Sequence, residues 1–424
     1  MPRFYRKEEV SDVDVKRVVL PNGMRLISER VAGSASVGVG LWADVGSRQE
    51  TLSKNGIAHF IEHEVFKGTE GRSMREIMRS IESRGGMLNA FTTKEHTCYY
   101  AWTRTIYLDE AVNILHELAL RPKFTERDIA RERSVIIEEI RGLEDEADEM
   151  LFDLFEQELF GSHPLAKTVI GTEKTVKSFH RDDLLAFHKK HYSPERLAIV
   201  ASGAHSHDVF FEIAERLFSK EPPSKRKVKN TPEKLSRKVV HKTVTREGAA
   251  QAHLVIGRRS PNIYAEKLAA SSALVTLLGV GMSSRLNLRL REEMGLAYEA
   301  MAFHSPYSDV GCIGLYAAVT DENIEKATNE MFKILRGLFT KEISSAELER
   351  TKEQMIGSAV LSMEAITTRL MRTGQNEMYY ERYIPIEEEI RKIAALTLND
   401  VRAIAEELFR DETALSVVSI VPKN

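Results

Sequence analysis

The chain has 424 residues, about twice the usual size of one domain, so two or more domains are expected. Hydrophobic residues make up 42% and charged residues 29%, which is typical of a soluble globular protein with a core. A net charge of -3 and a pI near 6.5 favour neither a nucleic acid nor a membrane as the main partner.

The cysteines and the apolar runs of the sequence indicate which kind of site and which compartment to expect. The two cysteines, Cys98 and Cys312, lack CxxC spacing, so neither a disulfide framework nor a thiolate metal site is expected. Neither the N-terminal segment nor any later stretch has the apolar run of a signal peptide or a bilayer span. A cytoplasmic protein is therefore expected, with a mature organellar protein freed of its leader as the alternative.

Hydrophobic periodicity and turn residues predict alternating strands and helices. Pro21-Asn22-Gly23, for example, predicts a turn between the first two strands. In chain order, the expected elements are strands within 15–31 and 35–48, helices over 56–66 and 74–85, strands within 88–104, a helix over 108–120, a long charged helical stretch over 126–160, a helix over 182–192 and a strand over 197–203.

Residues 219–238 are rich in Lys, Pro and Ser and nearly free of large apolar groups, which is typical of a linker. We therefore expect one domain over 1–218 and another over 239–424. Both end in the same helix-to-strand order, and the matched positions are Asp183 with Asp400, Leu184 with Val401, Ala186 with Ala403, and Tyr192 with Phe409. The expected fold class is α+β, with two homologous domains that each have a mainly antiparallel sheet and helices packed on one face.

The segment His59-Phe60-Ile61-Glu62-His63 carries the clearest chemical signal. On a helix, positions i and i+4 share a face, so His59 and His63 can present two imidazoles to one ion. A catalytic zinc ion takes three protein ligands and leaves one position for water, whose proton a nearby carboxylate such as Glu62 can accept. The third ligand should be a carboxylate, and the long helix after Glu126 is its expected source.

A motif of five residues can also occur by chance. With 13 His and 63 acidic residues in 424, roughly 0.06 matches are expected by chance. The alternative is a helix whose two histidines face solvent or a satisfied core.

Five ordered segments together carry a resemblance to a known family. With HFIEHEVFKGT, GGMLNAFTTKEHTCYYA, ERSVIIEEI, HPLAKTVIGT and SSRLNLRLREEMGLAYEA, the chain resembles the pitrilysin/insulysin family of inverzincins over nearly its whole length. The closest likeness is to the processing-peptidase-like branch of similar length. The resemblance implies a Zn2+ cofactor held by His59, His63 and Glu139, with Glu62 as general base.

The resemblance also implies roles for neighbouring residues. Glu132, seven residues before Glu139, corresponds to a group that supports the metal ligands. Glu64 is a departure, because the family usually carries Met or Leu there, but it is rotated off the ligand face and should not abolish zinc binding.

Substrate contacts are implied in both halves. Asn89, Ala90 and Phe91 are similar to an exposed edge strand on which a peptide can add itself, the alternative being an ordinary buried strand. Arg291 and Tyr298 match an arginine and a tyrosine that approach the substrate near the metal and could steady an oxyanion. A surface salt bridge and a core tyrosine are the alternatives.

The expected function is a zinc metalloendopeptidase acting on peptides or unfolded segments. The alternative is a non-catalytic or regulatory subunit of a processing-peptidase-like complex, although such subunits typically lose part of the metal set that this chain keeps. The resemblance implies that two chains complete a chamber, so a homodimer is expected, with a heterodimer with a related subunit as the alternative.

Overall fold

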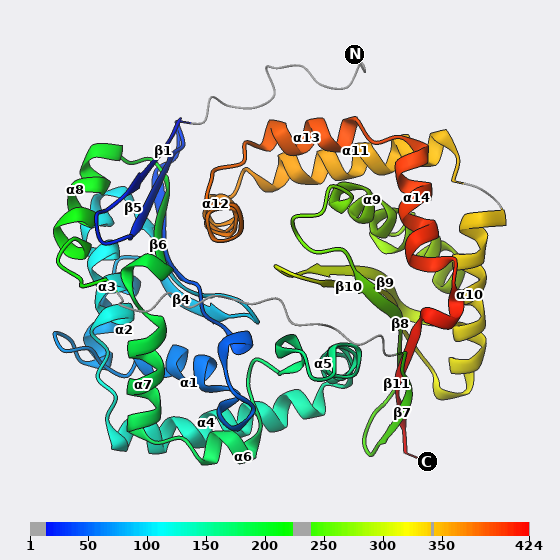
Figure 1. The fold of residues 1–424 in the computed structure, drawn as a ribbon, viewed down its shortest axis with the longest axis horizontal. Coiled ribbons are helices and arrows are strands. Elements are labelled where there is room, and N and C mark those ends of the chain that lie inside the picture. The colour runs from blue at the N-terminus through cyan, green and yellow to red at the C-terminus, as the bar shows by residue number, and fades with distance from the viewer. Residues whose placement is uncertain (1–13, 224–238, 341–342, 424) are drawn as a thin grey trace. The chain divides into compact units, whose positions relative to one another are not determined.

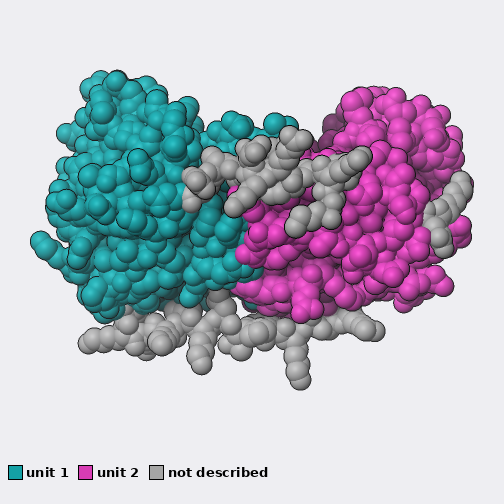
Figure 2. All heavy atoms as spheres, turned by 90° about the horizontal axis from the view of Figure 1, so that it is seen from above, with its two compact units in different colours: residues 1–140, 167–231, 360–385 teal, residues 141–166, 232–359, 386–424 magenta. Residues whose placement is uncertain are grey.

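The computed structural model describes residues 14–223, 239–340 and 343–423. They form two compact units, shown as a ribbon in Figure 1 and coloured separately in Figure 2. So far as they are described, the first unit takes residues 1–140, 167–231 and 360–385, and the second takes 141–166, 232–359 and 386–424.

The units are not the contiguous domains 1–218 and 239–424 that the sequence predicts. Residues 141–166 of the first half belong to the second unit, and residues 360–385 of the second half belong to the first. The reason is an exchange of helices, described below. Of the expected linker 219–238, residues 224–238 lie outside the described part of the chain.

The first unit is built on a six-stranded sheet in the order β1-β2-β6-β3-β5-β4. Only β2 and β6 pair in parallel; the other neighbours among the described strands are antiparallel. The strands are β1 Asp14–Val19, β2 Arg25–Arg30, β3 Ser36–Ala43, β4 Met87–Thr92, β5 Thr97–Arg104 and β6 Leu197–Gly203.

Helices pack on both faces of this sheet. The helices of the unit are α1 Ile57–Val65, α2 Met74–Glu82, α3 Leu108–Leu120, α6 Glu173–Lys177, α7 Arg181–His191, α8 His207–Phe218 and α12 Ile366–Tyr380, together with most of α4 Glu126–Asp145. Helices α3 and α8 pack against β5, β3 and β2. Side chains alternate along β3, so fully buried Val37, Val39 and Leu41 share one face of it.

The opposite face is covered by α12, a helix from the C-terminal half of the sequence. On that side β3 carries Gly38, where an added Cβ would come within 3.1 Å of Leu370 on α12. Gly374 on α12 lies so close to the Trp42 indole that a Cβ there would be 2.1 Å from its Nε1. The prediction that helices pack on one face of the sheet is therefore incomplete, because helices cover both faces in this unit.

The second unit repeats this plan around a five-stranded sheet in the order β7-β11-β8-β10-β9. Its strands are β7 His241–Arg246, β8 Ala252–Ser260, β9 Ala297–Pro306, β10 Gly311–Val319 and β11 Ser416–Pro422. Its helices are α5 Ala147–Phe160, α9 Leu268–Gly279, α10 Ile324–Thr340, α11 Ser345–Ser362, α13 Ile386–Ala394, α14 Leu398–Phe409 and the π-helix η7 Asn287–Glu293. Helices α9, α10 and α14 share one apolar core with the sheet, and α5 shares another.

The two sheets have the same pairing order from β2 to β4 and from β7 to β9, with one parallel pair at the same place. Helix α7 leads to β6 as α14 leads to β11. The third residue of each helix is an aspartate that accepts from the backbone N–H just before the helix: Asp183 from His180 at 3.2 Å and Asp400 from Thr397 at 2.8 Å. The predicted α+β fold with two homologous, mainly antiparallel domains is confirmed.

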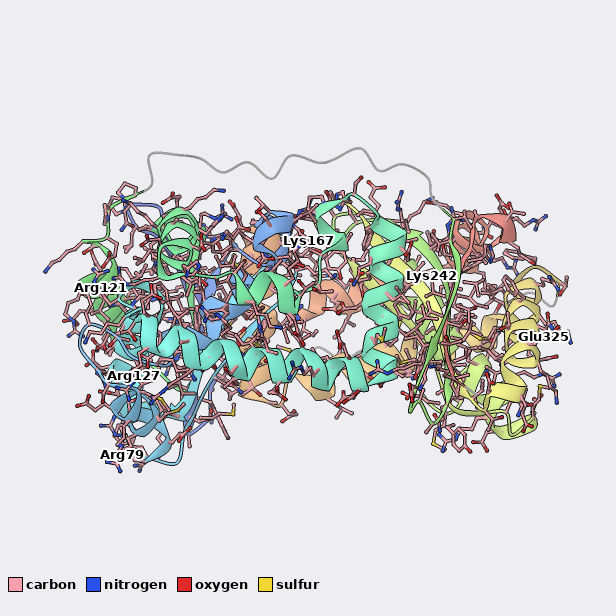
Figure 3. All side chains as sticks on the ribbon, turned by 90° about the horizontal axis from the view of Figure 1, so that it is seen from below. Arg79, Arg121, Arg127, Lys167, Lys242 and Glu325 are labelled. Atoms are coloured by element: carbon pink, nitrogen blue, oxygen red, sulfur yellow. The ribbon has the colours of Figure 1, made fainter. Side chains whose placement is uncertain are left out.

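The long helical stretch 126–160 is two helices rather than one. Glu146 has extended backbone, with φ -94° and ψ 98°, and the chain turns there between α4 and α5 (Figure 3). Neither Gly nor Pro marks the break, so the sequence pattern did not reveal it. Beyond the break, α5 packs on the second sheet, where Glu158 is 2.7 Å from Lys242 of β7. Among the described residues, no helix is both long and apolar enough to cross a membrane.

Candidate metal centre

Helix α1 begins where the buried carboxylate of Glu50 accepts three hydrogen bonds. The donors are the backbone N–H groups of Gly56 and Ala58 and the side-chain amide of Asn55, each at 2.8 Å. Burial raises the pKa of Glu50 to about 7, although these hydrogen bonds favour its charged form. Gly56 has φ +94°, a conformation that favours glycine. The start of α1 is thus fixed by hydrogen bonds to the Glu50 side chain and by the backbone conformation of Gly56.

Two imidazoles from α1 and one carboxylate from α4 converge. The rings of His59 and His63 are 4.6 Å apart between centroids. His59 Nε2 is 3.7 Å from one oxygen of Glu139, and His63 Nε2 is 3.7 Å from the other. Within the described part of the chain, this is the one group of three His, Cys, Asp or Glu residues whose ligand atoms all lie within 4.8 Å.

The spacing of these atoms fits a zinc ion. Zinc lies about 2.0–2.2 Å from His and carboxylate ligands, so tetrahedral geometry separates the ligand atoms by about 3.4 Å. Each imidazole Nε2 is 3.7 Å from a different oxygen of Glu139, and one ligand atom from each of the three residues lies within 4.8 Å of the others, so small movements of the side chains reach that spacing. The Glu139 side chain is 41% exposed, which leaves one side open for water or substrate. Two nitrogens, one oxygen and an open position match the donor set of a catalytic zinc site.

Glu132 orients His63 from the side away from Glu139. One of its oxygens is 2.8 Å from His63 Nδ1, and the other is 2.6 Å from Lys67 Nζ. Burial by itself would raise the pKa of Glu132. The hydrogen bonds from His63 and Lys67 outweigh the effect of burial, so the pKa of Glu132 is lowered. A charged carboxylate accepts the Nδ1–H of His63 and leaves Nε2 as the free lone pair.

Burial and nearby charges shift the pKa values of the three ligand residues in different directions. Burial lowers the pKa of His59 to about 3, so this imidazole is neutral and able to bind a metal. Burial also acts to lower the pKa of His63, but Glu132 and Glu139 outweigh it, and the pKa is raised. Burial raises the pKa of Glu139. A cation held here would offset the clustered carboxylate charge.

Glu62 lies one position before His63 on α1, and its carboxylate is held from the sheet. Its Oε2 accepts a hydrogen bond from Thr92 Oγ1 at 2.6 Å. Burial raises the pKa of Glu62, and the Thr92 hydrogen bond offsets part of that rise. A partly buried carboxylate of raised basicity thus stands beside the three ligand atoms.

Comparison with known proteins places this arrangement in a family. Residues 25–173 match the family described as Insulinase (Peptidase family M16), and residues 178–355 match the Peptidase M16 inactive domain. The uncharacterized zinc protease YmxG of Bacillus subtilis is 36% identical over 406 residues, which are 96% of this chain and 98% of that protein. The chain belongs to the M16 peptidase family.

Further similar proteins cover nearly the whole chain. Uncharacterized zinc proteases of Mycobacterium bovis and Streptomyces coelicolor are 34% and 32% identical over 96% and 95% of this chain, and 94% and 89% of theirs. A protease from Helicobacter pylori covers 97% of this chain and 100% of its own, with a TM-score of 0.91 at 24% identity. A peptidase M16 inactive domain from Pseudomonas fluorescens covers 97% and 98%, with a TM-score of 0.87 at 19% identity. Both solved structures share the fold.

The M16 substrate residues expected from the sequence lie on β4. Within the described sheet, β4 is an edge strand that pairs with β5 and packs against α1. Asn89 is exposed, Ala90 and Phe91 are partly buried, and the Ala90 N–H donates to Asn89 Oδ1 at 2.8 Å. The strand therefore lies next to the helix of His59 and His63, and its contact with a substrate stays a prediction.

Arg291 and Tyr298 belong to the second unit. Arg291 lies in the π-helix η7 with its side chain 51% exposed, 3.9 Å from a carboxylate oxygen of Glu292. Tyr298 lies near the start of β9 and is 62% exposed. The core-tyrosine alternative is therefore wrong for Tyr298. The predicted roles of both residues beside the metal stay predictions.

Glu64 has an environment that the sequence did not reveal. It is fully buried, and neither carboxylate oxygen has a hydrogen-bond partner among the described residues. Burial, and then the charges of Glu132 and Asp128, raise its pKa to about 8, so the side chain is a neutral acid at pH 7. It points off the ligand face, as expected, but it is an interior group rather than a solvated one.

Two supporting residues were missed from the sequence, Lys67 and Thr92. Lys67 follows α1 and reaches Glu132, and Thr92 ends β4 and reaches Glu62. Each contact joins residues at least 30 positions apart and depends on packing between elements. No local pattern in the sequence marks either one.

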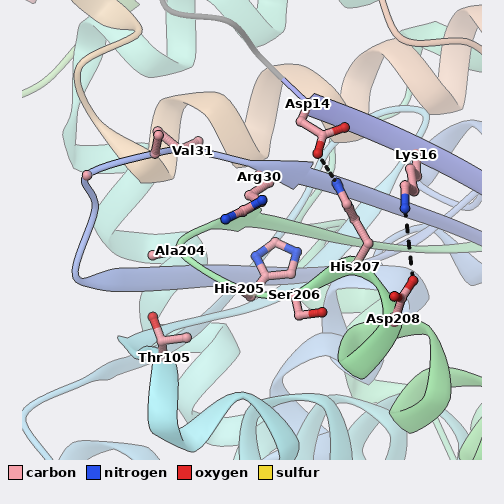
Figure 4. A pocket seen from close by; sticks show the side chains of 12 residues that line it. Asp14, Lys16, Arg30, Val31, Thr105, Ala204, His205, Ser206, His207 and Asp208 are labelled. Atoms are coloured by element: carbon pink, nitrogen blue, oxygen red, sulfur yellow. Dashed lines mark ion pairs between the residues drawn. The ribbon is translucent and has the colours of Figure 1, made fainter.

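A second polar cluster in the first unit lies beside an open pocket of about 520 Å³, which Asp14, His205 and His207 help to line (Figure 4). The hydroxyl of buried Ser28 is 2.7 Å from His205 Nε2 and 2.7 Å from His207 Nδ1. The other nitrogen of His207 is 2.9 Å from Asp14 Oδ2. Together, these two hydrogen bonds and this ion pair join β1, β2 and the start of α8. Within the described residues it holds no group of three ligand atoms close enough for a metal.

Proposed function

We propose that this M16 family member is a zinc-dependent endopeptidase that hydrolyses peptides or unfolded segments. The observation that carries the proposal is the convergence of His59, His63 and Glu139 within 4.8 Å, beside the carboxylate of Glu62. The names of the relatives, which are uncharacterized zinc proteases, support the same activity.

The reaction assigns one task to each side chain. His59, His63 and Glu139 would hold a zinc ion, which supplies an electrophile for the scissile carbonyl and acidifies a water molecule. Glu62 accepts the proton of the water as its oxygen adds to the carbonyl carbon. As the C–N bond breaks, Glu62 returns the proton to the leaving amine. Glu132 keeps His63 in the tautomer whose Nε2 lone pair is free.

Substrate would be held along its backbone. A peptide that adds itself to the edge of β4 at Asn89, Ala90 and Phe91 is aligned by main-chain hydrogen bonds, with little demand on its sequence. Arg291 and Tyr298 would orient the scissile carbonyl or steady its oxyanion. These contacts from five residues, three on β4 and two in the second unit, are the finer part of the proposal and rest on the family resemblance.

The competing function is a non-catalytic subunit of a processing-peptidase-like complex. Residues 178–355, which match an inactive domain, carry no His-x-x-Glu-His motif. The complete set of His59, Glu62, His63 and Glu139 in the first unit favours the enzyme.

A quenched peptide separates the two functions. Purified protein should contain one zinc per chain and cleave the peptide, and a chelator should abolish cleavage until zinc is restored. Glu62→Gln should keep zinc but lose nearly all turnover, because the water loses its proton acceptor. Glu139→Gln should lose zinc, and Glu138→Gln, at the exposed neighbouring position, is the matched control. Wild-type rates in Glu62→Gln, or zinc-loaded protein that cleaves no peptide, would exclude the proposed mechanism.

Assembly and location are part of the same proposal. A family member of this length is expected to close a chamber with a second chain, so we propose a homodimer, with a related subunit as the other possible partner. Light scattering on active enzyme is the test, and a strictly monomeric species with full activity would exclude the shared chamber. We also propose a cytoplasmic location, which cell fractionation can test.

A further inference from the structure

The carboxylate of Glu62 has one hydrogen-bond partner within the described part of the chain. That partner is the hydroxyl of Thr92, which is 2.6 Å from Glu62 Oε2. Such a short O–H···O contact is typical of a hydroxyl that donates to a charged carboxylate. The second oxygen, Oε1, is therefore the one left for a water molecule.

The direction of this hydrogen bond follows from the acceptor, because a charged carboxylate has no proton to donate. Thr97, which is paired with Thr92 in the β4–β5 register, donates its own proton to the Val45 carbonyl at 2.9 Å. The oxygens of Thr92 and Thr97 are 3.4 Å apart. The 3.4 Å contact is too long to compete with the 2.6 Å contact for the Thr92 proton, so Thr92 donates to Glu62.

The contact joins two elements with different tasks. Glu62 lies on α1, the helix of the two histidines, and Thr92 is the last residue of β4, the edge strand. The two elements pack against each other. The position of the Glu62 carboxylate is therefore tied to the strand on which a peptide would add itself.

We propose that Thr92 is a positioning residue for the general base, which rests on the function proposed above. Its hydroxyl holds Glu62 Oε2 so that Oε1 points toward the attacking water. A peptide that pairs with β4 steadies the strand and, through Thr92, the carboxylate. The base is thus best aligned when substrate is in place, which raises kcat rather than lowering KM.

Two variants of Thr92 isolate the hydroxyl. Thr92→Val keeps the shape of the side chain but removes the donor, and should lower kcat about 10- to 100-fold with KM and zinc content unchanged. Thr92→Ser keeps the donor and should stay within about threefold of wild type. Thr103→Val on β5 removes a buried hydroxyl that has no partner among the described residues, and is the matched control. Wild-type kcat in Thr92→Val would overturn the proposal.

A second measurement distinguishes two roles of Thr92: positioning the Glu62 carboxylate, and shaping strand β4. In the Glu62→Gln background, peptide binds without being cleaved, so its dissociation constant can be measured directly. Adding Thr92→Val should change that constant and the zinc affinity by less than about twofold. Weaker peptide or zinc binding would mean that Thr92 shapes β4 or the metal site, and the proposal would be wrong. A wild-type protein without peptidase activity would instead reject the function itself.

Discussion

Glu62 and Glu64 stand two positions apart on α1 and meet opposite surroundings. Glu62 faces the ligand atoms and accepts the Thr92 hydroxyl, whereas Glu64 points into the interior with no described partner. An acid that is buried without a hydrogen bond must give up its charge, and burial raises the pKa of Glu64 to about 8. The same helix therefore carries one carboxylate suited to proton transfer and one that weakens the fold.

Replacing Glu64 should stabilise the protein. Glu64→Met keeps the side-chain length and removes the need to protonate a buried acid on folding, so the free energy of unfolding at pH 7 should rise by about 2 kcal/mol. Urea unfolding of zinc-free protein measures the change. Glu138→Met at an exposed position of α4 is the control and should have little effect. A destabilised Glu64→Met variant would show that Glu64 has a partner in solution.

At the scale of elements, α7 carries one buried histidine, His191, and one partly buried histidine, His188. Burial lowers the pKa of His188 to about 4 and that of His191 to about 3, and neither ring nitrogen of His191 has a described partner. Each folded-state pKa is below the ordinary value of about 6.5, so these groups take up protons on unfolding. Their contribution to stability is present above about pH 6.5 and is lost as the pH falls toward the folded-state pKa.

Removing His191 should reduce the acid sensitivity of the fold. Between pH 7 and pH 5, the wild type should lose about 2 kcal/mol of unfolding free energy through this one residue, and His191→Leu should be spared that loss. Urea unfolding at both pH values gives the comparison, with His241→Leu at an exposed position of β7 as the control. Equal pH dependence in the wild type and His191→Leu would contradict the assignment.

Helix α12 docks on the first sheet through a buried ion pair as well as apolar contacts. Arg369 is 3.1 Å from Glu29 of β2, and the Glu29 side chain is fully buried. The other oxygen of Glu29 accepts from Thr373 and Ser202 at 3.0 and 2.8 Å. A charge buried this completely depends on its partners.

Breaking this pair from one side should be costly. Arg369→Met leaves Glu29 buried and unpaired and should lower the free energy of unfolding by about 3 to 5 kcal/mol. Adding Glu29→Gln should recover part of that loss, because the amide still accepts from Thr373 and Ser202. Lys177→Met in the exposed pair with Glu173 is the control and should have a much smaller effect. Additive effects of the two α12-site substitutions in a double-mutant cycle would contradict the coupling.

For the whole molecule, the exchange of helices means that neither half of the sequence covers both faces of its own sheet. Without α12, residues 14–223 would expose the apolar face formed by Ile27, Trp42, Cys98, Ala198 and Val200. Without α5, the second sheet would expose the face around Tyr316 and Ile420. Faces of this kind drive association when they are uncovered.

The two halves should therefore depend on each other for folding. Residues 1–223 expressed alone should aggregate or bind a hydrophobic dye, and co-expression with residues 239–424 should restore a soluble complex. Gel filtration and dye fluorescence measure both outcomes. A soluble fragment 1–223 with a cooperative unfolding transition would contradict the dependence.

Much of the prediction rested on local patterns in the sequence. The i, i+4 spacing of His59 and His63 needs only helical geometry, and the alternation along the strands needs only a sheet with a buried face. The matched ends of the two halves predicted the duplicated fold. Glu139 came from the family resemblance, because a ligand on a second helix leaves no local signal. The structure then brought its oxygens to 3.7 Å from both imidazoles.

The sequence by itself determined the fold class, the duplication, the family and the two-histidine motif, because each depends on residues close together in the chain or on ordered motifs. Only the tertiary structure decided that α5 and α12 change sheets, that Thr92 holds Glu62, and that Glu64 is buried without a partner. Those features depend on which surfaces meet when distant elements pack. The physical reason is that burial and hydrogen bonding between elements are set by the whole fold, whereas periodicity and turn chemistry are set by a few neighbouring residues.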